Sequence, residues 1–202
     1  MMKLTTRKLV VVAMLAAVSI ILGLTPLGFI PVPFSPAKAT IMHIPVIIGS
    51  IMEGPIVGAI VGLVFGVFSI YQAVVMPTNP AQFVFLDPVV AILPRVLIAF
   101  TSYYIYILII KVFKARMRQK PLIITASAFA GAVGTLTNTL GVLSAIYFRH
   151  GVEYAEKLGI EADTVGKFIV GIGITNGIPE IIVAIIVVSA VVQALQRLYN
   201  KH

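Results

Sequence analysis

Long runs of apolar residues, separated by short polar or proline-rich segments, dominate this chain of 202 residues. An α-helix needs roughly 17 to 25 mostly apolar residues to cross a hydrocarbon layer of about 30 Å, and the sequence offers several such runs. We predict an all-α membrane protein with one domain over residues 1–202 and a bundle of six transmembrane helices, at about 8–24, 40–52, 55–75, 89–110, 121–148 and 167–195. The second predicted helix is short.

The connections between the predicted helices differ in character. Residues 25–39 and 76–88 hold several prolines, which interrupt helices, so both are expected to form loops. A tight turn joins the second and third helices at Glu53–Pro55. Residues 111–120 are rich in Lys and Arg, whereas residues 149–166 carry charges of both signs.

Basic residues collect on one side of the predicted bundle. Ten of the fifteen Lys and Arg residues lie near the termini or between the fourth and fifth helices: Lys3, Arg7, Lys8, Lys111, Lys114, Arg116, Arg118, Lys120, Arg197 and Lys201. Because cytoplasmic loops retain positive charge, we expect both termini and this loop in the cytoplasm. The net charge of +8 is therefore a topology signal, and no basic face with interleaved aromatics indicates nucleic-acid binding.

Composition agrees with an integral protein of the cell membrane, because 59% of the residues are hydrophobic and only 11% are charged. The first apolar run follows basic residues, as in a secretory signal peptide, but no clean small-x-small cleavage site comes after it. We interpret this run as an uncleaved span. The absence of cysteine excludes disulfides, thiolate catalysis and cysteine-based metal sites.

Polar residues inside the predicted spans are the candidates for function: Arg95, Asn138, Asn176 and Glu180. A charge near the bilayer centre costs at least about 2.5 kcal/mol, so it must face the bundle interior, a partner or water. One hypothesis is a structural Arg95–Glu180 ion pair that only ties two helices together. We favour a polar pocket open to the outside and roofed by the proline-rich loops, because two amides beside an ion pair exceed what a tie requires. The full set of candidate ligand-binding residues adds Thr135, Asn79 and Gln72.

Motifs for catalysis are absent from the sequence. It contains no GxxxxGK[ST], HExxH or GxSxG pattern, and its three histidines are scattered, so we predict neither an enzyme nor a bound cofactor or metal. His43 is interpreted as a hydrogen-bonded packing residue. Gly58, Gly62 and Gly66 recur every fourth residue, which is typical of a close helix–helix contact.

Four stretches, in this order, carry a resemblance to a known family: TIMHIPVIIGSIMEGPIVGAIVGLVFG (40–66), LPRVLIAF (93–100), TLTNTLGVLSAIY (135–147) and NGIPEIIVAIIV (176–187). They look like the substrate-binding S component of energy-coupling factor (ECF) vitamin transporters. The resemblance covers nearly the whole chain. It implies that the chain captures a water-soluble vitamin from outside, in a pocket roofed by the loops after the first, third and fifth spans.

The resemblance also implies partners. In the family, the S component docks on a membrane coupling subunit that carries two ATPases, so ATP is hydrolysed by separate subunits, and it is thought to topple in the membrane to release the vitamin. The family's docking signature is an alanine-x-x-x-alanine pair in the first span. Ala13 and Ala17 match that pair.

The vitamin itself is a finer inference. The sequence is most similar to the pantothenate-type members, and Arg95 with several amides suits a small acid that bears hydroxyls and an amide. The absence of Trp argues mildly against a large stacked ring. Folate, biotin, riboflavin and pyridoxine stay open as ligands. An alternative that is not a transport function is a small membrane scaffold subunit that is packed by its glycines and has no ligand.

Overall fold

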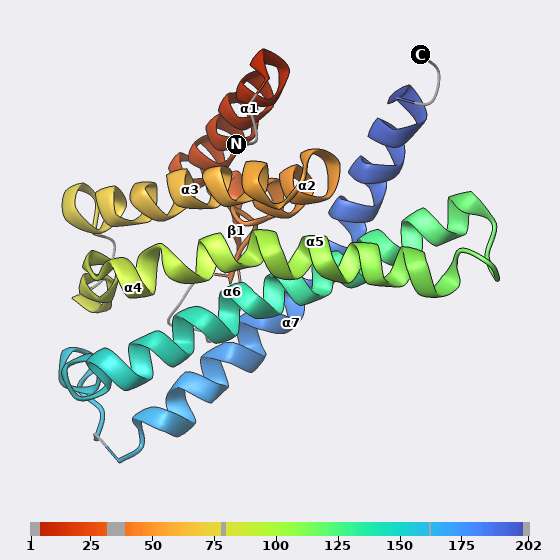
Figure 1. Ribbon diagram of the computed structural model, residues 1–202. Helices are drawn as coiled ribbons and strands as arrows, with labels where there is room; N and C mark the ends of the chain where they lie inside the picture. The colour runs from red at the N-terminus through yellow and green to blue at the C-terminus, as the bar shows by residue number, and fades with distance from the viewer. Residues whose placement is uncertain (1–4, 32–38, 78–79, 162, 200–202) are drawn as a thin grey trace.

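The structure is a computed structural model that describes residues 5–31, 39–77, 80–161 and 163–199, and it is almost entirely helical (Figure 1). Two short strands, β1 (Phe29–Ile30) and β2 (Ala39–Thr40), pair antiparallel with Phe29 opposite Thr40. The elements in chain order are α1 (Thr6–Leu24), η1 (Pro26–Gly28), β1 (Phe29–Ile30), β2 (Ala39–Thr40), α2 (Ile44–Glu53), α3 (Pro55–Val75), η2 (Pro80–Leu86), α4 (Pro88–Ala91), α5 (Leu93–Phe113), α6 (Gln119–Leu158) and α7 (Val165–Tyr199).

The described residues hold five helical stretches long and apolar enough to cross a membrane: α1, α3, α4 with α5, α6 and α7. The predicted second span at 40–52 is corrected to α2, which has only 10 residues and begins after the strand β2. Residues Ile44–Ile51 of α2 are all buried. A helix that is apolar on every side is stable only where neighbours surround it, so α2 forms part of the core and not a full span.

Helix α6 is longer than predicted. It runs for 40 residues to Leu158, whereas the sequence suggested an end near 148 and a loop of mixed charge after it. The helix ends at Gly159, which adopts a left-handed conformation with a φ of 68°. Charged side chains on the outward face and buried Tyr154 and Ala155 on the inward face keep the last turns amphipathic, and this explains why the helix continues.

The predicted fourth span is interrupted near its start. The chain forms η2 and α4, breaks at Ile92 and then continues as α5. Pro94 has no backbone N–H, so it cannot donate to the carbonyl group four residues earlier, and the helix is broken at this point. The predicted loop at 76–88 is also partly ordered, because η2 occupies Pro80–Leu86.

The glycines of α3 form its contact with α4 and α5. A side-chain carbon at Gly62 would lie 2.4 Å from the Arg95 carbonyl oxygen, and one at Gly66 would lie 2.7 Å from the carbonyl oxygen of Ala91. Only glycine allows the two backbones to approach this closely. Figure 1 shows α3 and α5 side by side, and the packing prediction for these glycines is confirmed.

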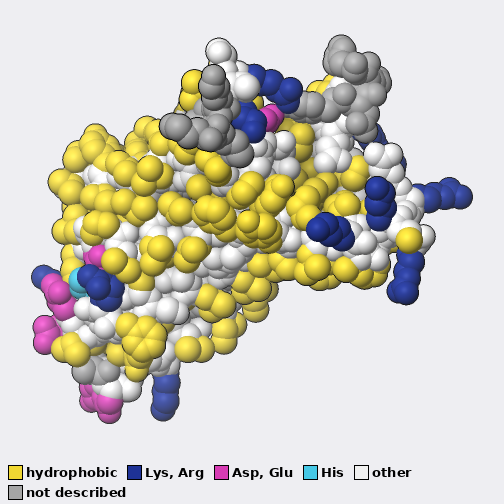
Figure 2. All heavy atoms as spheres, viewed as in Figure 1, with side chains coloured by type: hydrophobic (Ala, Val, Ile, Leu, Met, Phe, Trp, Pro, Cys, Tyr) yellow, Lys and Arg dark blue, Asp and Glu magenta, His cyan; other side chains and the backbone are white. Residues whose placement is uncertain are grey.

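The two ends of the bundle differ in charge. Figure 2 shows a broad hydrophobic belt, with Lys and Arg gathered over the end where α5 connects to α6 and acidic side chains over the end where α6 meets α7. An ion pair of 3.0 Å between Arg7 and Glu53 brings the start of α1 to the turn between α2 and α3. The basic connection Lys111–Lys120 is exposed along most of its length.

Candidate functional site

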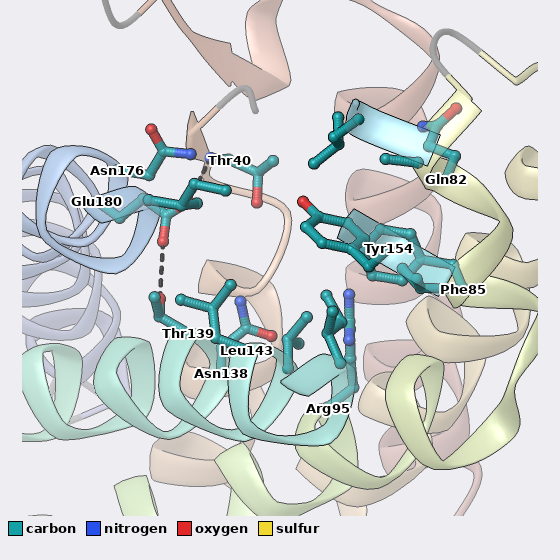
Figure 3. A pocket seen from close by; sticks show the side chains of 16 residues that line it. Thr40, Gln82, Phe85, Arg95, Asn138, Thr139, Leu143, Tyr154, Asn176 and Glu180 are labelled. Carbon is teal, nitrogen blue, oxygen red and sulfur yellow. Dashed lines mark hydrogen bonds between the residues drawn. The ribbon is translucent and has the colours of Figure 1, made fainter. Parts of the chain in front are cut away.

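A cavity of about 300 Å³ lies between β2, η2, α5, α6 and α7 (Figure 3). Its polar lining residues come from all five of these elements and include four residues that the sequence predicted. Apolar side chains make up the rest of the wall. The lining residues are Thr40, Ala81, Gln82, Val84, Phe85, Arg95, Asn138, Thr139, Val142, Leu143, Ile146, Tyr154, Leu158, Ile172, Asn176 and Glu180.

Arg95 owes its position to the break between α4 and α5. In a continuous helix the carbonyl oxygen of Val90 would accept a hydrogen bond from residue 94, but residue 94 is a proline. The side chain of Arg95 donates to this oxygen instead, with an Nη1–O distance of 2.6 Å. The proline that precedes the arginine therefore creates the acceptor that holds it.

Aromatic rings also hold the Arg95 guanidinium. Its central carbon lies 5.3 Å from the centroid of the Phe65 ring and 5.2 Å from that of Phe85, distances at which a cation is attracted to a ring face. The side chain is 5% exposed. Its Nε has no hydrogen-bond partner among the described residues. Arg95 is thus fixed in position and keeps a donor for another group.

Glu180 occupies a different wall of the cavity. Its Oε1 accepts a hydrogen bond of 2.7 Å from the backbone N–H of Thr40, and its Oε2 accepts one of 3.0 Å from the Thr139 hydroxyl (Figure 3). The side chain is 5% exposed. These contacts join α7 to the strand β2 and to α6, and they hold the carboxylate group at the cavity.

The hypothesis of a direct Arg95–Glu180 ion pair is corrected. In the part of the chain that the structure describes, no ion pair within 4.0 Å joins these residues. Arg95 bonds to a backbone carbonyl group in α4, and Glu180 bonds to Thr40 and Thr139. The two charges therefore belong to separate walls of one cavity, and each can face a different part of a ligand.

Two amides complete the polar lining. Asn138 on α6 and Asn176 on α7 are 7% and 5% exposed, and both line the cavity. The Asn138 Oδ1 has no hydrogen-bond partner among the described residues. A buried amide oxygen without a partner is unfavourable by about 1 to 3 kcal/mol, so this acceptor is suited to a ligand hydroxyl or N–H.

Of the seven candidate ligand-binding residues, four line the cavity and two, Thr135 and Gln72, do not. Thr135 is fully buried one turn below Asn138 and bonds to His43, with an oxygen–Nε2 distance of 2.9 Å. This contact confirms the interpretation of His43 as a hydrogen-bonded packing residue. Gln72 donates to the carbonyl oxygen of Gly23, which joins α3 to α1. Asn79 lies outside the described residues.

Other lining residues were missed by reasoning from the sequence. Thr40 was placed at the start of a span, and Tyr154 was placed in a loop. A signal for Tyr154 exists, because several lining positions on α6 are separated by four or eight residues: Asn138, Val142, Ile146, Tyr154 and Leu158. Extending that register beyond 148 would have predicted both the longer helix and the tyrosine. No comparable signal in the sequence points to Thr40.

The chemistry of the cavity suits a small polar molecule. It offers one guanidinium group, one carboxylate, two amides and hydroxyl groups beside an apolar wall, and this mixture is common in ligand sites. Among the described residues no three His, Cys, Asp or Glu side chains gather as metal ligands would. The arrangement can bind and orient a ligand that carries both an acidic group and hydroxyls.

Comparisons with known proteins agree with this picture. A family model described as "ECF transporter, substrate-specific component" matches residues 7–192. The chain is 33% identical to the pantothenic acid transporter PanT of Lactococcus lactis subsp. cremoris over 184 residues, which cover 84% of this chain and 83% of that protein. It is 29% identical to the pantothenate transporter PanT of Leuconostoc mesenteroides subsp. mesenteroides over 191 residues, 92% of this chain and 90% of the relative.

A solved structure, that of ThiT from Listeria monocytogenes, is similar in fold. Its TM-score to this chain is 0.65 at 19% sequence identity, with 95% of this chain and 96% of that chain covered. Transporter relatives and five apolar helices of spanning length establish a multi-pass protein of the cell membrane. The family match over residues 7–192 shows that the chain belongs to the substrate-specific components of ECF transporters, the S components, and not to a class of enzymes.

Proposed function

We propose that this chain is the pantothenate-binding S component of an ECF-type importer. Both relatives are named as transporters of this vitamin and match more than four fifths of the chain. The observation that carries the proposal is the buried Arg95 in a cavity that also holds Asn138, Asn176 and Glu180. Pantothenate has a carboxylate at one end, an amide in the middle and two hydroxyls at the other end, so its groups match those of the walls.

The match assigns a role to each wall. We assign the vitamin's carboxylate to the Arg95 guanidinium, because a buried cation needs a counter-ion when the cavity is shielded from water. Asn138 and Asn176 would hydrogen-bond the vitamin's amide or hydroxyls. Glu180, which accepts hydrogen bonds from Thr40 and Thr139, would also accept one from a hydroxyl of the vitamin. The apolar residues of α6 and η2 would pack against the vitamin's methyl groups.

The transport partners follow from the same proposal. The chain would dock on a membrane coupling subunit with two ATPases and would need no cofactor of its own. Ala13 and Ala17 lie on the exposed side of α1, together with Val10, Met14 and Val18. Small residues at i and i+4 leave a shallow strip where a second helix can approach closely. We propose this strip as the docking surface.

The orientation in the membrane can be tested on a chain without cysteine. We expect the basic connection between α5 and α6 to face the cytoplasm, as basic loops do. An Arg116→Cys variant should therefore resist an impermeant thiol reagent in intact cells and react only after the cells are opened. Glu156→Cys, near the opposite end of α6, is the matched control and should react from outside. Labelling of residue 116 in intact cells would contradict the orientation.

The ligand is tested by direct binding. We expect the purified protein to bind pantothenate in calorimetric titration with a stoichiometry of about one, and to carry pantothenate in native mass spectrometry when it is purified without added ligand. Folate, biotin, riboflavin and pyridoxine serve as competitors. Tighter binding of one of these vitamins would reassign the substrate. Absence of any bound vitamin would favour the scaffold alternative and contradict the proposal.

A further inference from the structure

Asp87 lies at the junction between η2 and α4, outside the cavity, and the binding site described above does not include it. Its Oδ1 accepts a hydrogen bond of 2.8 Å from the backbone N–H of Val89 and so caps α4. Its Oδ2 accepts hydrogen bonds from Arg149 Nε and from His150 Nε2, the latter at 3.0 Å. Asp87 thus fastens this junction to α6.

Two of the groups that hold Arg95 are close to Asp87 along the chain. Phe85, two residues before it, places its ring beside the guanidinium, as Figure 3 shows. Val90, three residues after it, supplies the carbonyl oxygen that accepts from Arg95 Nη1. Two of the three groups that hold Arg95 are therefore within three residues of the point where the segment is anchored.

The segment needs an external anchor because it is short. α4 has only four residues, and a single helical turn is not stable by its own hydrogen bonds. The anchor is well formed: the Asp87 side chain is only 10% exposed, and the ring of His150 also packs edge-on against Phe83 of η2 at a centroid distance of 5.8 Å. Two side chains of α6 therefore hold both η2 and α4.

The anchor keeps its charge under ordinary conditions. Burial acts to raise the pKa of Asp87, but the hydrogen bonds from Arg149, the backbone and His150 lower it to about 2. The group is therefore an ionised carboxylate at any pH used for binding. Its contact with Arg149 is a charge-assisted hydrogen bond, which is stronger than a bond between neutral groups.

We infer that Asp87 is a positioning residue for ligand binding: by anchoring η2 and α4 to α6, it sets the place of Phe85 and of the Val90 carbonyl group and thereby aims the Arg95 guanidinium at the acidic end of the ligand. The inference rests on the proposed function, because it uses a carboxylate ligand. It predicts that loss of the anchor weakens the binding of an acid far more than the binding of the same molecule without its acid group.

The test compares pantothenate with pantothenol, the alcohol that replaces the carboxylate, in calorimetric titrations. Asp87→Asn keeps a good helix cap and removes the charge, and Arg149→Met removes the partner while keeping an apolar stem. Each variant should bind pantothenate about 3- to 10-fold more weakly, which is less than the loss expected when a charge-assisted hydrogen bond from Arg95 is removed, because the guanidinium is displaced and not deleted. Binding of pantothenol should stay within about twofold of wild type, and this also shows that the variants are folded.

A matched ion pair at the other end of the bundle provides the control. Arg7 and Glu53 are 60% and 7% exposed, close to the 50% and 10% of Arg149 and Asp87. Arg7→Met and Glu53→Gln should leave the affinities for both compounds unchanged. An equal loss of acid binding in these controls would overturn the inference, because any lost ion pair would then have the same effect.

The same substitution in a protein that already carries Arg95→Ala distinguishes positioning of Arg95 from a direct contact between Asp87 and the ligand. If Asp87 acts through Arg95, then Asp87→Asn should change pantothenate binding by less than about twofold when Arg95 is already alanine. Full additivity of the two losses would overturn the inference, and so would unchanged acid binding in Asp87→Asn alone. If wild type itself binds both compounds equally, the carboxylate assignment fails and the inference fails with it. The wild-type titration therefore distinguishes failure of the carboxylate assignment from failure of the positioning role of Asp87 alone.

Discussion

Arg95→Ala is expected to weaken pantothenate binding by about one to several orders of magnitude. Charge-assisted hydrogen bonds to arginine are worth roughly 1.5 to 3 kcal/mol each, and a bidentate pair makes two of them, while about 1.4 kcal/mol corresponds to a factor of ten. Titration calorimetry on the purified protein measures the change. Arg95→Lys should recover only part of the loss, because lysine keeps the charge but lacks the planar fork.

Structural damage must be distinguished from loss of a ligand contact. Glu180 bonds to Thr40 and Thr139 and not to Arg95, so Arg95→Met should leave the carboxylate's own partners in place and give folded protein. Arg116→Ala, on the exposed basic connection, is the control for loss of an arginine and should bind normally. The carboxylate assignment would be wrong if pantothenol bound wild type as tightly as pantothenate does.

The polar part of the site could be predicted because the membrane makes such residues conspicuous. In a chain with only 11% charged residues, an arginine and a glutamate inside apolar runs must face each other, a ligand or water. Arg95, Asn138, Asn176 and Glu180 all line the cavity. The sequence does not reveal which groups bond to each other, because the partner of Arg95 is a backbone carbonyl group freed by Pro94 and the partner of Glu180 is the backbone of a strand.

The spanning helices could be predicted from the length of the apolar runs. The elements whose structure depends on tertiary packing could not. The apolar runs and the glycine contact between α3 and α5 follow from spacing alone. The short helix α2 could not be told from a span by hydropathy, since a helix buried in protein is as apolar as one in lipid. The sequence around η2 is proline-rich and typical of a loop, and contacts with α3 and α6 stabilise the ordered turn in the structure.

The binding site and the proposed docking surface lie on different parts of the molecule. Segment 40–43 connects the cavity to the buried side of α1, because the Thr40 N–H bonds to Glu180 in the cavity while the Met42 carbonyl oxygen accepts from Ser19 of α1 at 3.1 Å. Ser19 is fully buried, on the side of α1 that faces α2 and α3, whereas Ala13 and Ala17 are exposed. Substitutions on the exposed side should therefore leave the cavity unchanged.

Ala13→Trp and Ala17→Trp are expected to abolish ATP-driven uptake of pantothenate and copurification with the coupling subunit, and to leave pantothenate binding by the isolated chain within about twofold. Helices meet in lipid by close packing, because lipid tails solvate leucine as well as another helix does, so a bulky side chain at a small-residue contact separates them. Uptake of labelled pantothenate, affinity copurification and titration calorimetry measure the three quantities on the same variants.

A matched control exists on α7, where Ala190 and Ala194 form another exposed alanine-x-x-x-alanine pair. Ala190→Trp adds the same bulk to an exposed helix face and should leave uptake and copurification intact. Equal loss in this control would contradict the assignment of docking to α1, and normal uptake in both α1 variants would contradict it too. Loss of uptake with full pantothenate binding, in the α1 variants alone, would show that this chain captures its ligand at one surface and meets its partner at another.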